Sequence, residues 1–198
     1  MNEPRLIIVS APSGSGKTTI AQEMLKRHSD IVFSVSATTR VKRGNEADGR
    51  DYYFIPKIEF EHRVAENELL EWEEIYGDYY GSLRSEVDHA TAASKGILFD
   101  VDVKGALNIK RQYHHSAVTI YIQPPSVDVL TERLKNRKTE SVAQIEKRLE
   151  RAPMELEQSA KFDFCVVNDD LKRAVDEVDA IVTRFMNQNQ LLQKEETL

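Results

Sequence analysis

The residues best suited to chemistry lie near the amino terminus, in the stretch Ser10–Thr19, which reads S-A-P-S-G-S-G-K-T-T. A short apolar run precedes this stretch, and a segment with helical spacing follows it. A strand, a glycine-rich turn and a helix in that order are typical of a phosphate-binding loop, because N–H groups of the turn and of the first helical turn point at the anion. The sequence therefore predicts a phosphorylated ligand at this turn.

The side chains of this loop fit that chemistry. Gly14 and Gly16 allow the backbone to curl closely around an anion, because they carry no side chain. Lys17 supplies a mobile positive charge for the β- and γ-phosphates of a nucleotide, and the Thr18 hydroxyl suits Mg²⁺. The pattern G-x-x-x-x-G-K-[ST] fails at one position, where Ala11 replaces glycine. The alternative is an ordinary Gly/Ser turn, which is less favoured because Gly-Lys-Thr opens a helix directly after a buried strand.

Two aspartates end a later apolar strand, in the run I-L-F-D-V-D at 97–102. In P-loop enzymes an aspartate at such a strand end lies beside the loop and holds Mg²⁺ directly or through water. Alternate residues of a strand share a face, so we expect Asp100 and Asp102 to reach the same cleft. The alternative interpretation is a pair of solvated acids.

Two segments are rich in arginine, although the net charge of the chain is −6. The segment 34–52 carries Arg40, Arg43 and Arg50, and guanidinium groups suit phosphate oxygens. The segment 130–151 carries further arginines interleaved with acids, as expected of a lid that closes over phosphates. A solvated loop and a salt-bridged surface helix are the respective alternatives.

Length and composition limit the class of protein. A chain of 198 residues fits one domain with small inserted lobes. The acidic balance disfavours a nucleic-acid partner. The single Cys165 excludes an intrachain disulfide, and its apolar neighbours predict a buried thiol. With no signal peptide and no long apolar run, we expect a cytoplasmic protein without a membrane partner.

Apolar strands alternate with helical segments along most of the chain, which predicts an α/β fold with a central parallel sheet flanked by helices. The stretch 34–85 breaks this alternation, because it has several β-like runs and one short helix. It is expected to form an inserted lobe, with Ser82 capping the helix that follows. The main strands are expected at 6–9, 31–36, 97–101, 118–122 and 164–167, and the main helices near 17–28, 105–113, 126–137, 142–158 and 170–193.

In their order and spacing, these motifs resemble the guanylate kinase family over nearly the whole chain. The shared motifs are S-x-P-S-G-x-G-K at 10–17, S-x-S-x-T-T-R-x-x-R-x-x-E-x-x-G-x-D-Y at 34–52, E-W at 71–72, Y-Y-G-S at 79–82, D-x-D-x-x-G at 100–105, P-P-S at 124–126, R-L-x-x-R at 133–137 and V-N-D-D-L at 167–171. The resemblance implies a P-loop nucleoside monophosphate kinase fold with an inserted GMP-binding lobe and a helical lid. The implied parts are a P-loop core of 1–33, 86–126 and 152–198, a GMP-binding lobe of 34–85 and a lid of 127–151.

The resemblance also implies a role for each matching residue. The implied ATP-binding residues are Ala11, Pro12, Ser13, Gly14, Ser15, Gly16, Lys17, Thr18, Arg133, Arg137 and Asn168, the last two near the ATP base. The implied GMP-binding residues are Ser36, Arg40, Arg43, Tyr52, Glu71, Tyr80, Ser82 and Asp102. Thr18 and Asp100 are implied ligands of Mg²⁺, and the implied catalytic residues are Lys17, Arg43, Arg137 and Arg148.

The implied reaction transfers the γ-phosphoryl group of ATP to GMP, giving ADP and GDP, with Mg²⁺ as cofactor. No general base is assigned, because the acceptor phosphate is already an anion. One alternative is a kinase for another monophosphate; the other is a non-catalytic guanylate-kinase-like module that binds proteins. The module is disfavoured because Lys17 is present. Lys104 and Lys138 depart from the family pattern, and the sequence leaves dGMP use and the oligomeric state open.

Overall fold

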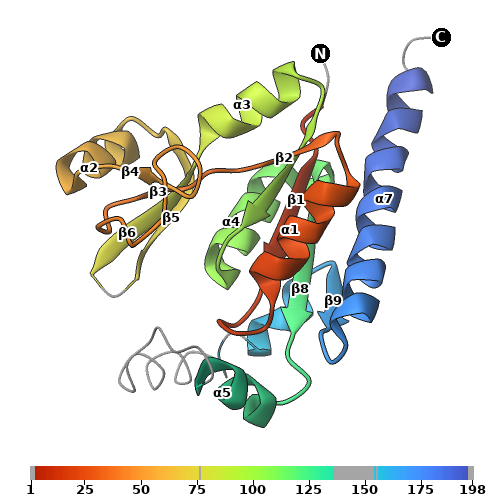
Figure 1. The fold of residues 1–198 in the computed structure, drawn as a ribbon. Helices are drawn as coiled ribbons and strands as arrows, with labels where there is room; N and C mark the ends of the chain where they lie inside the picture. Colours follow the sequence, from red (N-terminus) through yellow and green to blue (C-terminus); the bar gives the residue numbers. More distant parts are fainter. Residues whose placement is uncertain (1–2, 76, 136–153, 155, 196–198) are drawn as a thin grey trace.

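The computed structural model describes residues 3–75, 77–135, 154 and 156–195. Its centre is a parallel sheet with the strand order β2-β7-β1-β8-β9 (Figure 1). These strands are β1 (Leu6–Ser10), β2 (Ile31–Phe33), β7 (Gly96–Asp100), β8 (Ala117–Gln123) and β9 (Phe164–Val167). The α/β fold predicted from the alternation of strands and helices is confirmed.

Helices cover both faces of this sheet, and the alternation of side chains along β1 shows why. Ile7 and Val9 pack into the core shared with α1 (Lys17–Arg27) and α7 (Leu171–Glu195). Leu6 and Ile8 point the other way, into the core shared with α3 (Arg84–Ala92) and α4 (Val103–Tyr113). Because all four side chains are fully buried, β1 is the central strand of a sheet covered on both sides.

A second, smaller sheet lies beside the first, at the left of Figure 1, with the strand order β4-β3-β6-β5. Its elements are β3 (Ala37–Thr38), β4 (Tyr53–Phe54), β5 (Leu69–Ile75), β6 (Asp78–Leu83) and the helix α2 (Lys57–Ala65). It has a core of its own around Phe60, Leu69 and Leu83. We call residues 34–85, the bounds expected from the sequence, the lobe from here on.

Three further described helical elements flank the central sheet. Helix α5 (Val127–Lys135) follows β8, and Figure 1 shows it below the sheet, near the turn that precedes α1. Two short 3-10 helices, η1 (His114–Ser116) and η2 (Ser159–Lys161), precede β8 and β9. Most of the helix expected at 142–158 lies outside the described residues. Within the described part, every helix is too short or too polar to span a bilayer.

Three local expectations were wrong. The strand expected at 31–36 ends at Phe33, because the chain leaves the central sheet there to enter the lobe. Ser82 does not cap α3; it lies within β6, where its hydroxyl bonds to a neighbouring strand. Cys165 is exposed, because β9 is the edge strand of the sheet and only Val166 of that strand is buried.

Candidate active site

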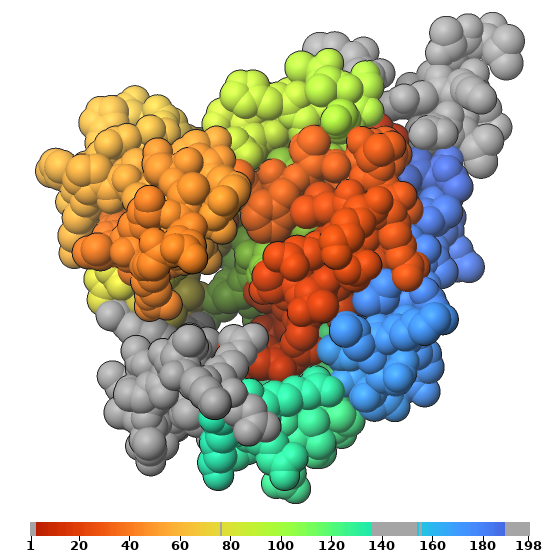
Figure 2. Space-filling model, in the orientation of Figure 1, coloured from red at the N-terminus to blue at the C-terminus, as the bar shows by residue number. Residues whose placement is uncertain are grey.

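A cavity of about 800 Å³ opens between the glycine-rich loop and the lobe. Figure 2 shows this hollow between the orange lobe and the red amino-terminal part of the core. The core contributes Ala11, Pro12, Ser13, Gly14, Gly16, Lys17, Thr18, Asp100 and Asp102, and the lobe contributes Ser36, Tyr52, Glu71 and Tyr80. Two groups of predicted site residues, separated along the sequence, therefore face one space.

Both glycines of the loop are required by their backbone and by their surroundings. Gly14 has φ +99° and Gly16 has φ +91°, a region that residues with side chains rarely adopt. A methyl group at Gly14 would lie 3.1 Å from both Leu130 and Leu134 of α5. Ala11, the departure from the loop pattern, has no such positive φ and packs in the central core, so a methyl group is accommodated there.

Lys17 and Thr18 converge on Asp100 at the end of β7. Strands β1 and β7 are in parallel register, which pairs Val9 with Asp100 and brings the aspartate beside the loop. The Lys17 Nζ lies 2.5 Å from Asp100 Oδ1 and donates to the Val101 carbonyl at 2.9 Å. The Thr18 hydroxyl donates to Asp100 Oδ2 at 3.2 Å. The positive charge of Lys17 and the negative charge of Asp100 balance each other. The Thr18 hydroxyl and the Asp100 carboxylate are two adjacent oxygen atoms of the kind that bind a hard metal ion.

On the lobe side, Glu71 is a buried carboxylate with 9% exposure. It faces Ser82 across the β5–β6 pair, and the Ser82 hydroxyl donates to Glu71 Oε1 at 2.7 Å. Burial raises the pKa of Glu71, against the opposing effect of that hydrogen bond. Ser82, which was predicted to bind GMP, thus forms a hydrogen bond to the Glu71 carboxylate, which lines the cavity.

Asp102 is the N-cap of α4, and its Oδ1 accepts a hydrogen bond from the Gly105 N–H at 2.8 Å. Burial, followed by a hydrogen bond with Glu73, raises the pKa of Asp102 to about 7. Glu73 also lines the cavity and forms an ion pair with Lys104 at 3.1 Å. Glu73 was not among the site residues predicted from the sequence, although the two-residue period of a strand puts it on the same face as Glu71.

Replacing Asp102 by asparagine should make the stability of the unliganded protein less dependent on pH. The folded-state pKa of about 7 exceeds the ordinary value of 3.8, so the folded state holds an extra proton between these values. The wild type therefore loses stability as the pH rises from about 4 to about 7, while Asp102→Asn keeps a capping oxygen without the charge. We expect Tm of the variant to exceed that of the wild type at pH 8 by more than at pH 4.5, measured by circular dichroism. Asp88→Asn, at an exposed position of α3, is the control, and an equal Tm difference at both pH values would contradict the assignment.

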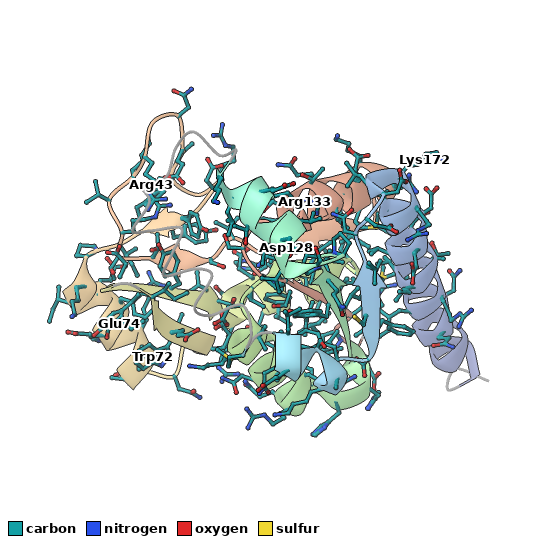
Figure 3. The ribbon with its side chains drawn as sticks, turned by 90° about the horizontal axis from the view of Figure 1, so that it is seen from below. Arg43, Trp72, Glu74, Asp128, Arg133 and Lys172 are labelled. Carbon is teal, nitrogen blue, oxygen red and sulfur yellow. The ribbon has the colours of Figure 1, made fainter. Side chains whose placement is uncertain are left out.

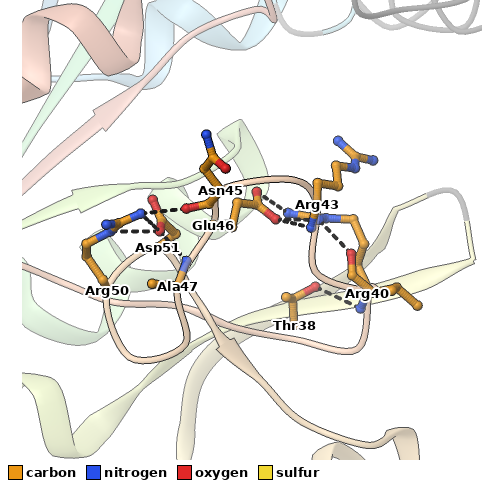
Figure 4. Close-up of polar contacts among 9 residues, drawn as sticks. Thr38, Arg40, Arg43, Asn45, Glu46, Ala47, Arg50 and Asp51 are labelled. Atoms are coloured by element: carbon orange, nitrogen blue, oxygen red, sulfur yellow. Dashed lines mark hydrogen bonds and ion pairs between the residues drawn. The ribbon is translucent and has the colours of Figure 1, made fainter.

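Arg40 is buried on the lobe and already has an anionic partner (Figure 4). Its Nη1 and Nη2 donate to the two Glu46 carboxylate oxygens at 2.9 and 2.8 Å. Its guanidinium also lies 5.3 Å from the centre of the Tyr52 ring. The hydrogen bonds to Glu46 raise the pKa of Arg40 despite its burial. Glu46 was missed as a functional residue, although it is the acid of the R-x-x-R-x-x-E pattern.

Arg43 is exposed, and its side chain extends away from the Glu46 carboxylate in Figure 4. Its backbone N–H donates to Glu46 Oε2 at 2.8 Å, so Glu46 orders both arginine positions of the loop. Tyr52 and Tyr80 line the cavity with their rings 6.0 Å apart, whereas Arg40 and Arg43 lie outside its lining. The structure thus brings the two tyrosines and Arg50 to the cavity, whereas Arg40 lies behind the Tyr52 ring and Arg43 is exposed on the loop.

Asn168 is hydrogen-bonded to the glycine-rich loop, and Arg133 is hydrogen-bonded to Asn168. Asn168 is 4% exposed, and its side-chain Nδ2 donates to the Ser15 carbonyl at 2.7 Å. The Arg133 Nη2 donates to the Asn168 carbonyl at 3.0 Å. Neither residue lines the cavity, and Figure 3 shows Arg133 on α5, apart from Arg43 on the lobe. Arg137 and Arg148 lie outside the described residues.

Comparison with known proteins gives one consistent result. The family model described as Guanylate kinase matches residues 3–185. The guanylate kinase of Chlorobaculum tepidum is 46% identical over 188 residues, covering 95% of this chain and 96% of the relative, and that of Bacteroides fragilis (strain YCH46) is 44% identical over 185 residues, covering 93% and 91%. A crystal structure of guanylate kinase from Anaplasma phagocytophilum matches with a TM-score of 0.76 at 29% identity, covering 92% of this chain and 86% of that one. The chain belongs to the guanylate kinase family.

Proposed function

We propose that the protein transfers the γ-phosphoryl group of ATP to GMP, giving ADP and GDP. One observation carries this proposal: a single cavity has the glycine-rich loop with Lys17 at one side and the buried carboxylate of Glu71 at the other. The loop with Lys17 is suited to a polyphosphate, and the Glu71 carboxylate is suited to a nucleotide base that presents hydrogen-bond donors.

On the acceptor side, Glu71 would receive the N1–H and N2 amino groups of guanine, and Ser36 would donate towards O6. The Ser82 hydroxyl bonds to Glu71, and Asp102 lies near Glu71 at the start of α4. Tyr52, Tyr80, Arg40 and Arg43 would hold the GMP phosphate. The stacking of Arg40 on Tyr52 supports this grouping, because it places a guanidinium directly behind a cavity-lining phenol.

On the donor side, the amides of the loop from Ala11 to Thr18 and the Lys17 ammonium would bind the ATP phosphates. Arg133 and Asn168 would act on the same side, with Asn168 holding the loop through Ser15. The distal arginines Arg137 and Arg148 are proposed to come from the lid.

The described residues fit a bound magnesium ion. The Thr18 hydroxyl and the Asp100 carboxylate are adjacent hard oxygen donors in the cavity, and Mg²⁺ in nucleotide sites needs few protein ligands besides phosphates and water. When bound, the ion would neutralise charge on the transferring phosphoryl group. Lys17 would then turn from Asp100 towards the phosphates.

The chain's own contribution would be position and charge. No described residue is needed as a general base, since the acceptor oxygen is already anionic. Water in an open site would compete as acceptor, so we propose that the lobe of 34–85 and the lid of 127–151 close around both substrates on the core of 1–33, 86–126 and 152–198. Closure would bring the lobe's arginines towards the loop's lysine.

The test is a coupled assay of ADP formation with GMP, dGMP, AMP, UMP and CMP as acceptors in turn. We expect GMP to give the highest kcat/KM, by roughly 100-fold or more over AMP, because a mismatched base leaves buried polar groups unpaired. A preference for another monophosphate would replace the guanine assignment by the alternative kinase, and the absence of turnover with every acceptor would favour a binding module.

A further inference from the structure

Gly105 occupies the third position of α4, where the backbone gives no reason for glycine. It is buried within a regular helix and does not have a positive φ. Glycine in the interior of a helix is less favourable than alanine. A glycine at such a position therefore points to a steric reason for the missing side chain.

The steric reason is the carboxylate of Glu71. A methyl group on Gly105 would lie 2.6 Å from Glu71 Oε2, 3.0 Å from Glu71 Cδ and 3.1 Å from Asp102 Oδ1. The first distance is far shorter than a carbon–oxygen contact allows, so one of the two groups would have to move. Glu71 thus sits in the space that a side chain at position 105 would fill.

Glu71 cannot move away without losing a bond. Its other oxygen, Oε1, accepts the 2.7 Å hydrogen bond from the buried Ser82 hydroxyl. Asp102, on the other side, is fixed by the Gly105 N–H at 2.8 Å. A methyl group would therefore displace the Glu71 carboxylate, lengthen the Ser82 bond, or shift the start of α4.

The close approach also has an electrostatic effect. Gly105 lies in the first turn of α4, where unpaired backbone N–H groups create a partial positive charge. A carboxylate at the surface of this turn is stabilised, which offsets part of the burial that raises the pKa of Glu71. Displacement by a methyl group would weaken this interaction.

We infer that Gly105 is a positioning residue for base recognition: its missing side chain forms the slot that aims the Glu71 carboxylate into the cavity. This inference rests on the proposed function, in which Glu71 reads guanine. A carboxylate displaced by about 1 Å no longer meets both donors of the base, and such misplacement costs on the order of 10²-fold in rate. The ATP side of the cavity is formed by other elements and should be unaffected.

The experiment is a double-mutant cycle of Gly105→Ala and Glu71→Asp, because aspartate is one methylene shorter and vacates the slot. In the wild-type background, Gly105→Ala should lower Tm and reduce kcat/KM for GMP on the order of 10- to 100-fold, with KM for ATP within about twofold. In the Glu71→Asp background, the same change should leave Tm unchanged or raise it, since only helix propensity remains. The cycle therefore predicts strong coupling in Tm and in GMP kinetics.

Asn108→Ala, one turn further along α4 and outside the cavity, is the matched control. It should change neither KM for GMP nor KM for ATP. If Gly105→Ala alone does not fold, the double variant should still fold, and its failure would overturn the inference. Additive effects in an active enzyme would overturn the inference and leave the proposed function standing. A wild type that does not phosphorylate GMP would overturn the proposed function, while coupling in Tm would still establish the contact between the two residues.

Discussion

Replacing Glu71 by glutamine is expected to lower kcat/KM for GMP by roughly 100-fold or more, while KM for ATP changes little. Guanine presents two adjacent donors, N1–H and the N2 amino group, and a carboxylate in the plane of that edge accepts both. Glutamine keeps the shape but replaces one acceptor oxygen with a donor. Because Glu71 is only 9% exposed, water cannot compensate for the mismatch.

The preference for GMP over AMP should shrink in the same variant, measured as the ratio of the two kcat/KM values. Adenine presents an acceptor at N1, which a carboxylate repels and an amide N–H would attract. Glu74→Gln is the matched control, since it makes the same change at an exposed position of β5, at the outer side of the lobe in Figure 3. If the preference is equal in Glu71→Gln and wild type, Glu71 does not read the base.

Replacing Lys17 by methionine should leave the fold intact and lower kcat on the order of 10²-fold or more. The variant removes a positive charge that is held at the entrance to the first turn of α1, 2.5 Å from Asp100. In the proposed reaction this charge stabilises the phosphoryl group during transfer. Methionine has a similar length and fills the same space without the charge.

Circular dichroism and steady-state kinetics test this prediction together. Lys26→Met, on the exposed side of the same helix, is the control and should retain normal turnover. A folded Lys17→Met protein with nearly normal kcat would remove Lys17 from the mechanism. An unfolded one would assign the lysine a structural role through its pair with Asp100.

The central sheet and the loop could be predicted from the sequence because their signals are local. The apolar run of β1, the glycines at 14 and 16 and the lysine that follows them lie close together in the sequence, and the glycines permit the positive φ values of the turn. The same holds for β9, whose bounds at Phe164–Val167 match the prediction. The exposure of Cys165 in β9 does not match the prediction, because β9 is an edge strand and its place depends on the order of strands in the sheet.

The side-chain partners within the site could not be predicted, because they join elements that are distant in sequence. The bond from Asn168 to the Ser15 carbonyl spans 153 positions, and no local pattern encodes it. Glu46 is near Arg40 in sequence, but its role as a bidentate partner depends on how an irregular loop folds back. Glu73 was within reach of the strand period, but the proximity of Asp102 required the packing of α4 on the lobe.

The packing of the glycine-rich loop against Leu130, Leu134 and Asn168 has a thermodynamic consequence. A loop held only by its own backbone would lose conformational entropy when an anion orders it, and this loss would weaken binding. Here the apolar surface of α5 and a buried amide already hold the loop. Much of the conformational entropy of the loop is therefore lost when the protein folds, so ordering of the loop opposes ligand binding less.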